Sequence, residues 1–218
     1  MKSTEKVIVI FGGSFNPPTN SHLSLAEQIY CHFDEVEKVI FMPVSDAYPK
    51  KDLLQAKYRV KMLELVCRVN PHFEVSTLEV DAPVLLSSID TLRKMKQVYE
   101  DYEIWLVLGT DNLKVMTSWP CYQALLKDFR CLVLERNKDI LEHILGQNPL
   151  LQPYKEHFIK MKESIHSDAS ATLLRQKLRE GQSIRYMVPD EVYFYIVEKG
   201  LYTVVPTSHN KIGNNNRL

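Results

Sequence analysis

The segment from Val7 to His22 constrains the fold of this chain more than any other. An apolar run over residues 7–11 leads into Gly12 and Gly13, two prolines follow, and Thr19 and His22 stand where a helical pattern begins, over residues 23–33. A strand, a tight loop and a helix N-terminus in this order attract phosphate, because unpaired backbone N–H groups and the positive end of the helix dipole face the loop. The two glycines let a ligand approach the main chain closely.

Apolar runs alternate with segments of helical period along most of the remaining chain. We expect strands over residues 7–11, 39–43, 73–76, 104–108, 131–134 and 157–160, and helices over 23–33, 56–69, 88–99, 122–126, 139–145, 171–180 and 190–199. This alternation predicts an α/β fold with a Rossmann-like, doubly wound, mainly parallel sheet and a small helical C-terminal portion. Ligands of such sheets bind at the carboxyl ends of the strands.

Length and charge favour one neutral domain. The chain has 218 residues, 45% of them hydrophobic, which is enough for a single well-packed core. We expect one domain over residues 1–207 and a polar, flexible tail over residues 208–218. Lysine plus arginine and aspartate plus glutamate number 27 each, so the net charge of zero favours neither nucleic acid nor an anionic membrane as a partner.

Four cysteines, at positions 31, 67, 121 and 131, are widely separated and form no CxxC pair. This spacing argues against a zinc ribbon or a disulfide framework, and we predict no transition-metal site. The N-terminal apolar run is too short for a signal peptide or a membrane span. We therefore expect a cytoplasmic protein.

The order of the first motif carries more information than its glycines alone. A strand, then Gly12-Gly13-Ser14-Phe15-Asn16-Pro17, then Thr19 and His22 at a helix start resemble the first signature of the nucleotidyltransferase superfamily, a Gly-rich turn followed by His-x-Gly-His or Thr-x-Gly-His. The resemblance implies that His22 and Thr19 contact nucleotide phosphates as catalytic residues, and that Gly12, Gly13, Ser14 and Phe15 line the phosphate site. Ser21 replaces the usual glycine, and Asn16 stands where aspartate is common. The alternative for His22 is a helix-terminal residue bonded to backbone or water.

A second motif opens a later helix. Capping alone explains Ser170 or Thr172 at such a position. The segment from Ser170 to Arg175 also resembles the superfamily's second signature, Ile-Ser-Ser-Thr-x-Ile-Arg. That resemblance implies that this helix start and Arg175 hold the β- and γ-phosphates of ATP. Ala171 replaces the second serine and removes one hydroxyl donor.

Further segments resemble one family, the nicotinate/nicotinamide mononucleotide adenylyltransferases. Residues 181–190 and the closing Gly-Leu-Tyr at 200–202 are similar to the C-terminal end of that family, and Gly109-Thr110-Asp111-Asn112-Leu113 followed by Trp119 resembles its Gly-x-Asp-x-Leu…Trp region. The resemblance covers about residues 7–202. It implies that Gly109 and Asp111 lie near the nucleotide sugars and that Trp119 stacks on the pyridine ring. Core packing is the alternative for Trp119.

Two other segments add candidates to the site. Residues 43–51 resemble the eukaryotic branch of the family, where Lys50 and Lys51 could bring positive charge to phosphates; a solvated lysine pair is the alternative. Ser88 and Thr91 match a helix start that holds the pyridine substituent in bacterial relatives. Arg59 is a candidate for supporting the site.

The implied reaction is adenylyl transfer from ATP to nicotinate and/or nicotinamide mononucleotide, which forms the dinucleotide and releases pyrophosphate. Mg²⁺ held mainly by the triphosphate would assist. The expected partners are these small molecules, with a homo-oligomer left open. One alternative is a superfamily transferase for phosphopantetheine or choline phosphate, which would not need Trp119. Another is a non-catalytic nucleotide-binding regulator, which the departures at Ser21 and Ala171 allow.

Overall fold

The computed structural model describes residues 6–135, 139–161 and 170–203. Within these ranges six strands form one sheet in the order β3-β2-β1-β4-β5-β6. Every neighbouring pair is parallel. The strands are β1 (Val7–Gly13), β2 (Val36–Pro43), β3 (Phe73–Val75), β4 (Glu103–Gly109), β5 (Arg130–Leu134) and β6 (Phe158–Lys160). The predicted α/β, Rossmann-like sheet is thereby confirmed, and the strand order reverses between β1 and β4, where such sheets bind ligands.

The helices follow the strands in alternation. They are α1 (Asn20–His32), α2 (Ala56–Cys67), α3 (Ser88–Val98), α4 (Thr110–Val115), α5 (Tyr122–Asp128), α6 (Leu141–Gln147), α7 (Ala171–Arg179) and α8 (Asp190–Lys199), with 3₁₀ turns η1 (Met116–Ser118) and η2 (Gln152–His157). None of the helices in the described ranges is long and apolar enough to cross a membrane.

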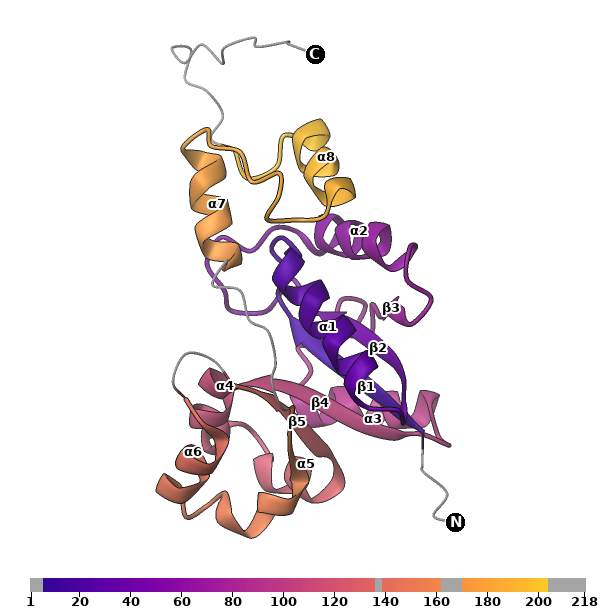
Figure 1. Ribbon diagram of the computed structural model, residues 1–218, viewed down its shortest axis with the longest axis vertical. Coiled ribbons are helices and arrows are strands. Elements are labelled where there is room, and N and C mark those ends of the chain that lie inside the picture. Colours follow the sequence, from indigo (N-terminus) through magenta and orange to yellow (C-terminus); the bar gives the residue numbers. More distant parts are fainter. Residues whose placement is uncertain (1–5, 136–138, 162–169, 204–218) are drawn as a thin grey trace.

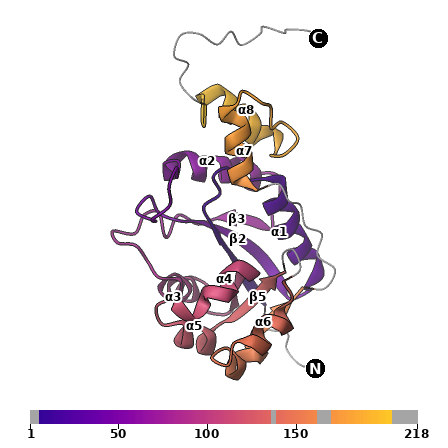
Figure 2. The same ribbon diagram turned by 90° about the vertical axis from the view of Figure 1, so that its left-hand side faces the viewer.

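Both faces of the sheet are buried, because side chains alternate along each strand. Ile8 and Ile10 of β1 point into a cluster with apolar residues of α3, α4, α5 and α6. Val9 and Phe11 point the other way, into a cluster that includes Leu25 of α1. Figure 1 shows α1 lying across β1 and β2, and in Figure 2 α3, α4 and α5 gather at the β4 and β5 half of the molecule.

The C-terminal helices form a third cluster. Leu174 of α7 and Ile196 of α8 are buried together with Met62 and Val66 of α2. Figure 1 shows α7 and α8 above α2 and the start of α1. This packing confirms the predicted helical C-terminal portion, and it carries α7 to the loop that follows β1.

The boundaries depart from the sequence-based ones where polar residues begin an element. Helix α1 starts at Asn20 rather than at 23, because Thr19 and His22 close a capping box at its N-terminus. Helix α4 and the 3₁₀ turn η1 were not predicted. Both are too short to show a helical period. The predicted tail over 208–218 lies outside the described residues, and the single domain over 1–207 stays a prediction.

Candidate active site

The turn after β1 is built around a buried aromatic ring. Phe15 is 1% exposed and packs edge-on against the rings of Phe41 and His22. A Cβ on Gly13 would come within 3.1 Å of the Phe15 ring, whereas a Cβ on Gly12 would meet no atom within 4 Å. Gly13 therefore makes room for the Phe15 ring because it has no side chain. At Gly12 no atom lies close enough to block approach to the main chain.

His22 is oriented by the N-terminus of its own helix. Its Nδ1 accepts a hydrogen bond from the Thr19 backbone N–H at 3.0 Å and lies 2.8 Å from Thr19 Oγ1. A backbone N–H can only donate, so Nδ1 is the acceptor and Nε2 carries the ring proton in the neutral imidazole. The pair predicted as catalytic thus places an N–H donor at the start of α1, where the helix dipole is positive.

Arg175 joins the second motif to the first. Its Nη1 donates to the Asn16 carbonyl oxygen at 2.8 Å across 159 residues of sequence, and its Nη2 donates to Thr172 Oγ1 at 3.3 Å. The residue is 6% exposed, and its buried Nε has no hydrogen-bond partner among the described residues. Ser170 caps α7 by accepting from the Leu173 N–H at 3.2 Å. The two predicted segments therefore meet at one place, joined by the guanidinium of Arg175.

One more cation approaches the same turn from the segment after β2. Lys50 Nζ donates to Ser14 Oγ at 2.9 Å. Enclosure of the amine lowers the pKa of Lys50, and repulsion from Arg175 and Arg59 lowers it further. Lys51 is exposed and makes no hydrogen bond or ion pair within the described residues. Of the predicted lysine pair, the structure brings only Lys50 to the turn.

Arg59 of α2 is fully buried beneath the turn. It donates to the carbonyl oxygens of Leu54 at 2.6 Å, Ser14 at 3.2 Å and Val44 at 2.8 Å, and to Asp46 Oδ1 at 3.1 Å. These bonds join the loops after β1 and β2 to α2. The expectation that Arg59 supports the site agrees with this geometry.

The hydrogen bonds of Asn16 were not predicted from the sequence. It is 0% exposed, and its Nδ2 donates to the Asp52 carbonyl oxygen at 2.8 Å. Its Oδ1 accepts from the Leu54 N–H at 3.4 Å and from Tyr202 Oη at 2.9 Å. The sequence offered one signal, the departure from aspartate at this position, but no means of identifying these distant partners.

The residues predicted to hold the mononucleotide follow other strands at the same edge of the sheet. Gly109 ends β4 and precedes α4, Asp111 is exposed in the first turn of α4, and Trp119 is half-buried after η1. Trp119 packs against the α3 to α6 core cluster, so the packing alternative is part of its role. Ser88 begins α3 behind its cap, Ser87. These side chains make no hydrogen bonds to one another within the described residues.

Thr91, the last predicted mononucleotide residue, is 3% exposed and donates through Oγ1 to Glu79 Oε1 at 2.8 Å. Burial raises the pKa of Glu79, and the Thr91 hydrogen bond offsets part of that effect. Glu79 was not among the predicted residues. A carboxyl in a loop after an edge strand has no sequence signal that distinguishes it from surface charge.

The candidate site is cationic rather than metal-chelating. The described residues contain no group of three or more His, Cys, Asp or Glu that could hold a metal ion. All four cysteines are free thiols.

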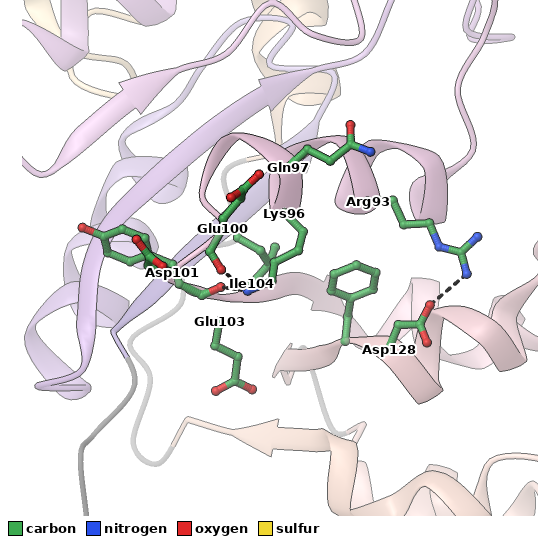
Figure 3. Close-up of a pocket in the computed structure, with 10 residues that line it drawn as sticks. Arg93, Lys96, Gln97, Glu100, Asp101, Glu103, Ile104 and Asp128 are labelled. Atoms are coloured by element: carbon green, nitrogen blue, oxygen red, sulfur yellow. Dashed lines mark hydrogen bonds and ion pairs between the residues drawn. The ribbon is translucent and has the colours of Figure 1, made fainter.

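A cleft of about 740 Å³ lies elsewhere, beside the first residues of β4 (Figure 3). Its cations are already paired: Arg93 bonds to Asp128 at 2.8 Å, and Lys96 donates to the carbonyl oxygens of Glu100 and Tyr102 at 2.6 and 2.8 Å. Because the amino ends of the strands line this cleft, it belongs to the opposite edge of the sheet from the two motifs.

Comparisons with known proteins agree with this arrangement. The sequence pattern of the Cytidylyltransferase-like family matches residues 10–177. A probable nicotinate-nucleotide adenylyltransferase of Caldicellulosiruptor saccharolyticus is 35% identical over 89% of this chain and 98% of its own length. A probable enzyme of the same name from Lachnoclostridium phytofermentans is 33% identical over 88% of this chain and 97% of its own.

A solved structure shares the fold. The nicotinic acid mononucleotide adenylyltransferase of Plasmodium falciparum, complexed with NaAD, superposes with a TM-score of 0.75 at 20% identity, covering 90% of this chain and 97% of the other. On the sequence matches, this chain belongs to the cytidylyltransferase-like family and, within it, to the nicotinate-nucleotide adenylyltransferases.

Proposed function

We propose that this protein transfers the adenylyl group of ATP to the phosphate of a pyridine mononucleotide, forming the dinucleotide in NAD biosynthesis and releasing pyrophosphate. The observation that carries the proposal is the meeting of the two motifs, in which Arg175 of α7 bonds to the Asn16 carbonyl while Lys50 bonds to Ser14. Cations from two distant segments thus reach the turn between β1 and α1. Such a site suits a polyphosphate.

In the proposed reaction an oxygen of the mononucleotide phosphate attacks the α-phosphorus of ATP. The bond from that phosphorus to the bridging oxygen breaks, and its electron pair leaves with pyrophosphate. Two polyanions must be aligned, so the protein acts by orientation and charge stabilisation, with no covalent intermediate. Orientation of this kind contributes roughly 7–11 kcal/mol.

The phosphate-side residues divide this work. His22 would donate its Nε2–H to the α- and β-phosphates beside Thr19, and the main chain at Gly12 and Gly13 would allow close approach. Arg175 would stabilise the leaving pyrophosphate through the positive charge of its guanidinium. The support for these roles is the orientation of His22 by the Thr19 N–H and the burial of Arg175.

Other residues complete the phosphate side. Lys50 would bring charge from the loop after β2, and Lys51 would reach the phosphates only on rearrangement of that loop. Ser14 and Phe15 shape the turn, and Ser170 and Thr172 hold the start of α7 and the guanidinium. Mg²⁺ would arrive with the triphosphate.

The acceptor we propose is nicotinate mononucleotide, which the names of the relatives favour. Trp119 would stack on its pyridine ring, because a flat ring with partial positive charge is attracted to an aromatic face. Asp111 and Gly109 would lie near the sugars, and Ser88 near the ring substituent. Thr91 would act through Glu79, since its hydroxyl is already bonded there. The free thiols suit the reducing cytoplasm.

The direct test supplies ATP, Mg²⁺ and either nicotinate or nicotinamide mononucleotide, and measures dinucleotide by chromatography and pyrophosphate by a coupled assay. We expect both assays to detect product, and we expect a higher kcat/KM for nicotinate mononucleotide than for nicotinamide mononucleotide. His22→Ala should lower turnover at least about a hundredfold with little change in ATP affinity. Removing one aligned transition-state donor costs about 3–4 kcal/mol. His32→Ala, on the exposed end of the same helix, is the matched control. Absence of dinucleotide, or near-normal turnover of His22→Ala, would contradict the proposal.

A further inference from the structure

The turn after β1 has a feature that catalysis by His22 and Arg175 does not by itself require. Asn16 connects four separate segments: its own turn, the loop containing Asp52 and Leu54, helix α7 through Arg175, and the residues after α8 through Tyr202. The amide satisfies its donor and acceptor groups in full burial. Its main-chain carbonyl is what Arg175 holds.

Strained backbone is concentrated around the same residue. The described ranges contain four non-glycine residues with positive φ, and three of them adjoin Asn16: Phe15 precedes it, Asp52 accepts its Nδ2–H, and Tyr202 donates to its Oδ1. Their φ angles are 43°, 58° and 65°. Left-handed conformations of such residues are unfavourable and persist where the surrounding contacts require them, often at functional sites.

Tyr202 reaches this point from the far end of the chain. Its hydroxyl lies 2.9 Å from Asn16 Oδ1, across 186 residues of sequence. Burial raises the pKa of Tyr202, so the hydroxyl stays protonated and acts as the donor in this bond. Since Asn16 Nδ2 is bonded to Asp52, a flip of the side-chain amide would break the bonds to both Asp52 and Tyr202.

We propose that Asn16 and Tyr202 are positioning residues that set the guanidinium of Arg175 for the leaving pyrophosphate. Tyr202 fixes the Asn16 side chain, and the fixed turn presents the carbonyl that holds Arg175 Nη1. Held in this way, the guanidinium keeps one orientation, with Nη1 on the Asn16 carbonyl oxygen and Nη2 on Thr172 Oγ1. This inference rests on the proposed function for the identity of the anion only.

Tyr202→Phe tests the proposal, because it removes one oxygen atom and leaves the ring in place. Inorganic tripolyphosphate is the probe, and its Kd is measured by phosphorus NMR titration for four proteins: the unchanged chain, Tyr202→Phe, Arg175→Ala and the double variant. We expect Tyr202→Phe to weaken binding about three- to tenfold, the effect of one lost hydrogen bond. In the Arg175→Ala background the same change should alter Kd less than twofold. Tyr195→Phe in α8 is the matched control and should leave Kd unchanged.

Comparing the four Kd values distinguishes positioning of Arg175 from a general effect on protein stability. Equal weakening in both backgrounds, or no weakening in either, would overturn the proposal whatever happens to Tm. Steady-state kinetics supply a second readout: KM for the mononucleotide should stay unchanged in Tyr202→Phe while KM for pyrophosphate in the reverse reaction rises. Tripolyphosphate binding needs no mononucleotide, so the two hypotheses can fail separately. If the four Kd values follow the expected pattern but no dinucleotide forms, the proposed function alone is refuted. Dinucleotide formation without coupling would refute this inference alone.

Discussion

Replacing Arg59 with methionine should destabilise the protein more than any change on its surface. The side chain is fully buried and donates to three main-chain carbonyls, of Leu54, Ser14 and Val44, at 2.6 to 3.2 Å. A stranded buried acceptor costs about 1–3 kcal/mol. The fourth partner, Asp46, is half exposed, so loss of that ion pair costs about 0–1 kcal/mol. Since the loops can relax toward water, we expect Arg59→Met to lower the free energy of unfolding by about 3–5 kcal/mol.

Urea unfolding followed by circular dichroism measures this quantity, and thermal unfolding should show a fall in Tm of about 2–4 °C for each kcal/mol. Arg59→Lys should fall between the two proteins, because an ammonium cannot reproduce the planar fork that reaches several carbonyls. Arg68→Met, at the exposed end of the same helix, is the control and should stay within about 0.5 kcal/mol of the unchanged chain. A loss below 1 kcal/mol for Arg59→Met would refute the view that this residue holds the loops together.

Three further substitutions test separate parts of the site. Trp119→Ala should raise KM for the mononucleotide about tenfold and leave KM for ATP unchanged, as loss of ring stacking predicts; a fall in Tm with no change in either KM would assign Trp119 to the core alone. Lys50→Arg should keep triphosphate affinity to higher pH in calorimetric titrations. Enclosure and neighbouring cations lower the pKa of Lys50, so binding strength that depends on its charge is complete below that pKa and is lost as the pH rises through it; identical pH profiles would exclude Lys50 from the anion site. Gly13→Ala should reduce stability by about 1–3 kcal/mol, because a methyl group would meet the Phe15 ring at 3.1 Å, whereas Gly12→Ala should unfold at an unchanged temperature; equal Tm values for the two would contradict the packing argument.

The sheet was predictable because its strands are buried on both faces and read as continuous apolar runs. Val9 and Ile10 point to opposite clusters, yet both must be apolar. The ends of elements were less predictable. Thr19 and Asn20 are polar residues that the apolar period of α1 does not include, so only their capping bonds reveal where the helix begins.

The candidate site shows the same division between local and long-range information. His22 and Thr19 are three residues apart, so the motif contained their geometry. Arg59 was a candidate for supporting the site, but only the fold reveals its burial and its bonds to the loops after β1 and β2. The bond from Tyr202 to Asn16 spans nearly the whole chain, and a single sequence holds no periodicity or spacing that would predict it.

The candidate phosphate site differs from the cleft at the other edge of the sheet in how its cations are paired. In that cleft Arg93 has Asp128 as a partner, and Lys96 is bonded to two carbonyls. At the β1 turn, by contrast, Lys50 and Arg175 form no ion pair within the described residues. Enclosure of the amine lowers the pKa of Lys50, and repulsion from Arg175 and Arg59 lowers it further. The charges of Lys50 and Arg175 repel one another, and a polyanion that binds between them removes that repulsion as well as adding its own hydrogen bonds. A ligand bound in this way must raise the stability of the folded chain by mass action, and its affinity must fall as salt screens the charges. Cleft volume predicts neither effect, whereas the unpaired cations around the start of α1 predict both.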